Sequence, residues 1–98
     1  MAIKKKFKAR NGVELEYHRI ALVNIEVNNQ ITVLRHSYLN EEGRRYEKDY
    51  EKGKIKGEPA FPYVDAEYMH MDYEDGMTVE KAYGWLKKQK GFEGAEDV

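Results

Sequence analysis

The sequence predicts an α+β protein that is predominantly antiparallel β: a small β-sandwich or curled sheet with one C-terminal helix. Three observations predict this fold class. Apolar and polar residues alternate over residues 13–18, as in a half-buried strand. Short polar turns at residues 10–12 and 28–30 separate such segments. Apolar residues then recur at three- and four-residue steps within residues 78–90, which is the spacing of a helix.

The first two strands are expected to form a hairpin around residues 10–12. Asn11-Gly12 is a strong turn dipeptide. A three-residue loop gives a register in which apolar side chains share one face and opposite charges meet on the other. The predicted pairs are Phe7–Leu15, Lys8–Glu14 and Lys6–Glu16.

The second hairpin turns at residues 28–30, where asparagine tolerates the left-handed backbone that a turn needs. The phase of the alternation shifts before it, which predicts a bulge near residues 18–20. The predicted pairs are Val27–Ile31, Ile25–Val33 and Ala21–Ser37.

The segment 44–52 has two interpretations. Tyr46 and Tyr50 are spaced as on one face of a helix. The same residues suit a solvated, charged edge strand. We favour the strand because residues 40–43 read as a type I turn closed by Gly43, and such a turn feeds a hairpin.

The remaining elements are one more strand, over residues 67–73, and the C-terminal helix, over about residues 78–90. Thr78 is expected to cap this helix and Gly91 to end it. The tail at residues 92–98 is expected to fray. A single domain over residues 1–91 is therefore predicted.

Composition restricts the function classes. The chain has 98 residues, a formal net charge of -1 and no cysteine, so disulfides and thiolate metal sites are excluded. The longest apolar stretch, residues 20–23, is too short to cross a bilayer, and the basic N-terminus lacks the apolar core of a signal peptide. We therefore expect no contact with a membrane.

No motif for catalysis, metal or cofactor binding stands out. The three histidines lack ligand spacing, and the acidic run at residues 72–76 does not fit the calcium-loop template. Ser37 and its neighbour His36 point to opposite faces of a strand, and the glycines are scattered singly. We predict a protein that is not an enzyme and has no cofactor, no metal site and no catalytic residues.

The tyrosines and acids of one segment are the least ordinary feature. From Glu58 to Glu80 the chain has seven acidic residues and no Lys or Arg, and three of its eight tyrosines lie there. Tyrosine offers a large rigid contact area and a hydroxyl group, and it is enriched at interfaces, although it also suits half-packed strands. Within an acidic segment at 58–75, the predicted interaction surface consists of Tyr63, Tyr68, Asp72, Tyr73, Glu74 and Asp75.

Four stretches resemble small proteins encoded in the tail or baseplate region of siphophages that infect Gram-positive bacteria. They are Tyr17-His18-Arg19-Ile20, the run from Ile31 to Tyr38, Arg44 with Tyr46-Glu47-Lys48, and the run from Met77 to Lys87. The resemblance covers most of the chain and implies a small β-sandwich-like virion or tail-accessory protein that makes ring or adaptor contacts. It brings no catalytic residues with it.

The function expected from these features is that of a non-enzymatic phage structural or tail-accessory protein. It would act through contacts with other tail proteins or with its own copies, in the virion or in the cytoplasm of the bacterial host. The alternative is a small nucleic-acid-binding or host-regulating protein that uses the basic N-terminal strand, namely Lys4, Lys5, Lys6, Lys8 and Arg10. The near-neutral charge disfavours nucleic acid as a partner.

Overall fold

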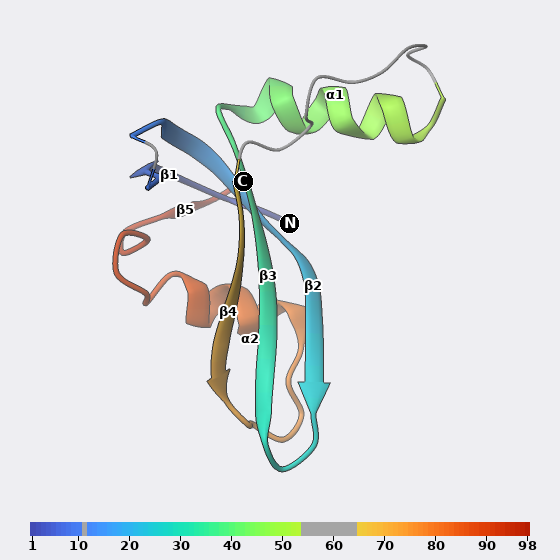
Figure 1. Ribbon diagram of the computed structural model, residues 1–98, viewed down its shortest axis with the longest axis vertical. Coiled ribbons are helices and arrows are strands. Elements are labelled where there is room, and N and C mark those ends of the chain that lie inside the picture. The colour runs from blue at the N-terminus through green and yellow to red at the C-terminus, as the bar shows by residue number, and fades with distance from the viewer. Residues whose placement is uncertain (11, 54–64) are drawn as a thin grey trace.

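The computed structural model describes residues 1–10, 12–53 and 65–98 and is an α+β protein dominated by one antiparallel sheet (Figure 1). The sheet has five strands in the order β4-β3-β2-β1-β5. The described residues form this single sheet and not the two packed sheets of a sandwich. The elements are β1 (Ile3–Lys8), β2 (Glu14–Glu26), β3 (Gln30–Tyr38), α1 (Glu41–Glu51), β4 (Asp65–Asp72), α2 (Val79–Leu86) and β5 (Glu96–Asp97).

Helix α2 covers one face of the sheet and forms the core with it (Figure 1). The Thr78 side chain accepts a hydrogen bond from the backbone N–H of Lys81, so it caps α2 as expected. The Tyr83 hydroxyl accepts a hydrogen bond from the Ile20 backbone and donates one to the Met1 carbonyl, each 2.8 Å long. The core consists of Ile3, Ile20, Ile31, Val33, Ala82, Tyr83, Leu86 and Phe92.

The register of the first hairpin is partly as predicted. Phe7–Leu15 and Lys8–Glu14 are confirmed, whereas Lys6 and Glu16 fall within a register shift and do not form a regular pair. The register shifts between Lys4 and Phe7, because β1 holds one residue more than β2 over this stretch. The ion pairs that form instead are Lys4–Glu16 at 3.2 Å and Lys6–Glu14 at 4.0 Å.

The second hairpin turns one residue earlier than predicted, at residues 27–29, with Asn28 in the left-handed region at φ 58°. Each predicted pair is therefore wrong: the partners of Ile31, Val33 and Ser37 are Ile25, Val23 and His18. Between the bulge and the turn, each β3 residue pairs with a β2 residue two positions before the predicted partner. Because side chains alternate with a period of two, each of them stays on its predicted face of the sheet. The bulge itself lies between Ile20 and Leu22, just beyond the expected position.

The segment expected to be an edge strand at residues 44–52 is part of helix α1, so that prediction was wrong. Asn40 caps the helix by accepting a hydrogen bond from the Gly43 backbone, and two glutamates in the first turn suit the helix dipole. Tyr46 and Tyr50 are more than a third exposed, and Glu47 is the buried residue of the helix. Burial of a carboxylate explains why no apolar stripe marked this helix.

The tail at residues 92–98, which we expected to fray, is held against β1. Phe92 is buried, and Glu96–Asp97 pair with Ile3 and Lys4. Helix α2 ends at Leu86 and not near residue 90, and a series of turns leads on to Gly91 at φ 92°. A side chain at Gly91 would approach the Phe7 ring to 3.0 Å, so glycine allows the turn to pack on that ring.

Candidate interaction surface

The sheet has a second face, opposite α2, that we call the outer face. Cross-strand partners share a face, so the register places three rows of side chains across β2, β3 and β4. Helix α1 lies at the end of the sheet that is opposite the turn between β2 and β3 (Figure 1). The rows are Glu26–Gln30–Asp72, Asn24–Thr32–His70 and Leu22–Leu34–Tyr68.

The row Leu22–Leu34–Tyr68 is apolar and accessible. Leu22 is 48% exposed and Tyr68 is 63% exposed, with the half-buried Leu34 between them. The next row is polar, and in it the Thr32 hydroxyl lies 3.0 Å from Nδ1 of His70. An apolar row beside an acidic end is a surface on which a protein partner could bury area.

The residues predicted as the interaction surface do not share one side of the molecule. Tyr68 and Asp72 belong to the outer face, whereas Tyr73 packs against the core and donates a hydrogen bond to Asp75 at 3.2 Å. Glu74 and Asp75 follow β4 and are exposed. Tyr63 lies outside the described residues. The interaction surface itself therefore stays a prediction.

Ser37, the single serine of the sequence, lies beside the ring of His18 on the neighbouring strand. The Ser37 hydroxyl lies 2.7 Å from Nδ1 of His18, and Nε2 of His18 lies 2.7 Å from the Lys5 carbonyl. The carbonyl can only accept, so Nε2 carries the proton and Nδ1 of the neutral ring accepts from Ser37. Burial lowers the pKa of His18, which favours this neutral form.

Because His18 and Ser37 are both wholly buried, a substrate could not reach this pair. Sequence spacing could not reveal it, since the two residues meet only through strand pairing. The arrangement resembles that of a nucleophile and its base. Its hydrogen bonds, however, link His18 on β2 to the Lys5 carbonyl on β1 and to Ser37 on β3, and so hold the three strands together.

Arg35 extends this buried network to β4. Its guanidinium donates to the Ser37 hydroxyl and forms ion pairs with Asp65 at 3.3 Å and Glu67 at 2.6 Å. The Phe7 and Phe92 rings lie on it, each with its centroid 5.0 Å from the guanidinium carbon. A buried charge needs such partners, so this cluster fixes β4 beside β3.

A second buried network attaches α1 to the sheet. The Glu47 carboxylate accepts hydrogen bonds from Tyr38 at 2.8 Å and from Arg44, and it forms an ion pair with Arg19 at 3.4 Å. Arg19 also donates to the Tyr38 hydroxyl at 2.9 Å. Burial is the main reason why the pKa of Tyr38 is raised to about 12.

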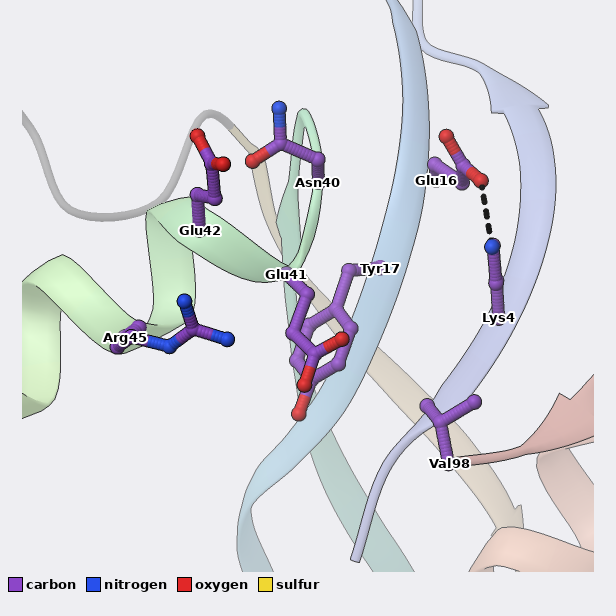
Figure 2. A pocket seen from close by; sticks show the side chains of 8 residues that line it. All are labelled: Lys4, Glu16, Tyr17, Asn40, Glu41, Glu42, Arg45 and Val98. Carbon is purple, nitrogen blue, oxygen red and sulfur yellow. Dashed lines mark ion pairs between the residues drawn. The ribbon is translucent and has the colours of Figure 1, made fainter.

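A cavity of about 360 Å³ lies between the start of α1 and the paired strands β1 and β2 (Figure 2). Three glutamates line it together with Lys4 and Arg45, and the Lys4–Glu16 ion pair spans the β1–β2 side. Burial and the nearby Glu41 carboxylate raise the pKa of Tyr17 in its wall. The mixed charges do not select one ligand class. The residues lining the cavity are Lys4, Glu16, Tyr17, Asn40, Glu41, Glu42, Arg45 and Val98.

Within the described ranges, no group of three or more His, Asp or Glu side chains could hold a metal ion. None of the helices among the described residues is long and apolar enough to cross a membrane. Two lysines of the basic N-terminal strand, Lys4 and Lys6, form ion pairs with neighbouring glutamates, which reduces the positive charge available to a nucleic acid.

Comparison of the chain with protein-family models, with curated proteins and with solved structures finds no match.

Proposed function

We propose that the protein is a non-enzymatic structural or tail-accessory protein of a bacteriophage that acts through protein–protein contacts in the virion or in the host cytoplasm. The phage assignment rests on the sequence resemblance. The contact assignment rests on one observation, the exposed apolar row Leu22–Leu34–Tyr68 on the outer face. The buried polar groups are engaged in holding the elements together, which supports contact rather than chemistry.

The occupant that we propose for the outer face is a second copy of the chain. A formal net charge of -1 gives copies little mutual repulsion. The charge is also segregated, because residues 1–49 contain 10 basic and 7 acidic residues whereas residues 50–98 contain 7 basic and 11 acidic ones. Acidic residues from the second half of one copy can therefore meet basic residues from the first half of another.

Light scattering over a range of concentrations tests this proposal. The wild type is expected to associate, and Tyr68→Ser is expected to shift the association to at least about tenfold higher concentration, because Tyr68 provides the most exposed part of the apolar row. Val79→Ser is the matched control, because Val79 is 54% exposed on α2, across the sheet from the outer face. A wild type that stays monomeric, or association that Tyr68→Ser leaves unchanged, contradicts the proposal.

The double charge reversal Asp72→Lys with Glu74→Lys tests the acidic end separately. Both residues are exposed, so the fold should persist while association weakens. Circular dichroism checks the fold, and sedimentation at low and high salt measures the association. Unchanged association would show that Asp72 and Glu74 are not part of the interface.

A further inference from the structure

Among the described residues, strand β4 pairs with a strand on one side only, so its other edge is unpaired. It pairs with β3 at eight consecutive positions without a register shift, and no other described strand lies beside it. Edge strands are commonly protected by charged side chains, above all lysine, by proline or by a bulge. The segment Asp65–Asp72 has no lysine and no proline, and its pairing with β3 has no bulge. Its charged side chains are the carboxylates of Asp65, Glu67 and Asp72, which protect the edge against acidic strands but not against basic ones. It therefore offers a regular row of backbone donors and acceptors to another strand.

A groove runs between this strand and helix α2. Its volume is about 400 Å³, and its lining includes Met71 from β4, Met77 from the following turn and Trp85 from α2. These three side chains are partly buried and pack against the core. Asp72 and Glu74 line the groove from the strand side, and Lys81 and Lys88 line it from the helix. A large apolar side chain would fit above the methionines and the indole.

Gly84 keeps this groove open. It lies inside α2, where glycine weakens a helix relative to alanine. A Cβ built at Gly84 meets nothing within 4 Å, and its backbone does not adopt a positive φ. The fold therefore does not require glycine here. Since Gly84 lines the groove, a larger side chain at this position would project into the space that a ligand would fill.

We propose that an extended peptide segment of another protein adds to β4 as a further antiparallel strand and places a large apolar side chain in the groove. This inference rests on the proposed protein-binding function and names the class of partner. Side chains of a strand alternate between faces, so the peptide residue opposite Met71 faces α2 and enters the groove. The preceding peptide residue, opposite Asp72, lies on the outer face. A lysine or arginine there would complement the carboxylate of Asp72.

A second copy of the chain fits this edge poorly. If two β4 strands paired antiparallel over their full length, Asp65 of each would face Asp72 of the other. Like charges directly opposite each other destabilise a strand pair. The acidic edge therefore favours a basic peptide over a second β4.

Fluorescence titration provides the test, because Trp85 is the single tryptophan and lines the groove. The probes are acetylated and amidated peptides of about ten residues that alternate threonine and valine around a central lysine followed by leucine, methionine or phenylalanine. A saturable change in Trp85 emission is expected for at least one probe. The same peptide N-methylated at every second residue should not bind, because it keeps its side chains but cannot pair with β4.

The matched variants are Gly84→Leu, which fills the groove, and Gly84→Ala, which barely enters it. Gly84→Leu should weaken peptide binding at least about tenfold, and Gly84→Ala much less. The proposal is overturned if no probe binds, if Gly84→Leu binds as tightly as the wild type, or if the N-methylated peptide still binds. It is also overturned if Gly84→Leu abolishes self-association, since the groove would then hold a second copy.

Failure of the peptide inference can be distinguished from failure of the proposed function. Leu22→Ser is expected to reduce self-association through the outer face while leaving peptide binding within about twofold of the wild type, because Leu22 lies on β2 and the peptide pairs with β4. Circular dichroism and the melting temperature establish for each variant that the protein is folded.

Discussion

The Ser37 hydroxyl of β3 lies 2.7 Å from Nδ1 of His18 on β2, and both side chains are wholly buried. On its other side, Ser37 accepts a hydrogen bond from Arg35, which carries the interaction on to β4. A neutral imidazole on β2, a hydroxyl and a guanidinium on β3, and a carboxylate on β4 thus form one chain across three neighbouring strands. Its stability depends on the protonation state of His18.

We expect the protein to lose stability as the pH falls below about 6.5. Burial lowers the pKa of His18 and of His36 in the folded state, so the unfolded chain binds protons first. The contribution of these histidines is complete above the unfolded pKa, near 6.5, and is lost as the pH falls through the folded pKa. Each group can contribute up to about 1.4 kcal/mol per pH unit within that window.

Urea denaturation at about pH 7.5 and about pH 5.5 measures this effect. The variant His18→Gln should be less stable than the wild type at the higher pH and should show a smaller drop between the two. An equal drop in both proteins would mean that His18 does not contribute to the pH dependence.

Replacing Arg35 should destabilise the protein strongly. In Arg35→Met the carboxylates of Asp65 and Glu67 lose their buried cation, and the stacked Phe7 and Phe92 rings lose the guanidinium that contacts both. Because Asp65 and Glu67 are 34% and 47% exposed, water screens the carboxylates that remain, and we expect a loss of about 1–3 kcal/mol from the broken hydrogen bonds and ring contacts. Hydrogen exchange should show β4 opening more often than β2. The exposed Arg10→Met provides the control, with a change of less than about 0.5 kcal/mol.

Helix α1 should detach from the sheet when Glu47 is changed. Glu47→Ala leaves the Tyr38 hydroxyl and the Arg19 and Arg44 guanidiniums without their shared acceptor, at a cost of about 3 kcal/mol. Amide exchange in α1 should accelerate while exchange in β2 and β3 stays slow. Glu51→Ala is the control on the same helix, because Glu51 is exposed. Similar exchange in the two variants would contradict the anchoring role of Glu47.

Alkaline pH should weaken the fold through Tyr38. Its pKa is raised from 10.0 to about 12, chiefly by burial, so the unfolded chain loses this proton first. The contribution of Tyr38 is complete below pH 10 and falls by about 1.4 kcal/mol per pH unit between the two values. Tyr38→Phe should show a shallower loss of stability over this window in urea titrations. A slope equal to that of the wild type would rule Tyr38 out as the cause.

Gly84→Ala should stabilise the protein by about 1 kcal/mol. Alanine is the better helix former, and its methyl group meets no neighbour within 4 Å at this position. Thermal denaturation measures the change. A destabilised variant would indicate that α2 needs glycine for packing, which would weaken the inference that glycine keeps the groove open.

The sequence predicted those features of the fold that follow from local pattern. Alternation identified the strands, and the Thr78 cap with apolar spacing identified α2. The register of the second hairpin could shift by two residues at no cost to the pattern, since both registers bury the same face. Helix α1 was one of two interpretations and was not the favoured one, because its buried residue is Glu47 and the sequence shows no apolar stripe there.

The buried polar clusters and the ordered tail could not be predicted from the sequence, because both depend on contacts between residues far apart in the chain. Arg35 occupies a core-facing position that a charged residue rarely fills, and it is accommodated by two rings and two acids from distant segments. Phe92 follows α2 in a short tail, where a single aromatic residue gives no periodic signal. Tyr68 and Asp72 were named from sequence, whereas the groove appears only once β4 lies beside α2.

The two rings on Arg35 come from opposite ends of the chain. Phe7 belongs to β1, and Phe92 precedes β5, the strand at the far border of the sheet from β4. Any tag or cut that disturbs the last residues, which form β5, would therefore loosen β4, four positions away across the sheet. Binding of a partner at β4 and a change in the C-terminal segment would therefore affect each other, because both involve contacts of the Arg35 guanidinium.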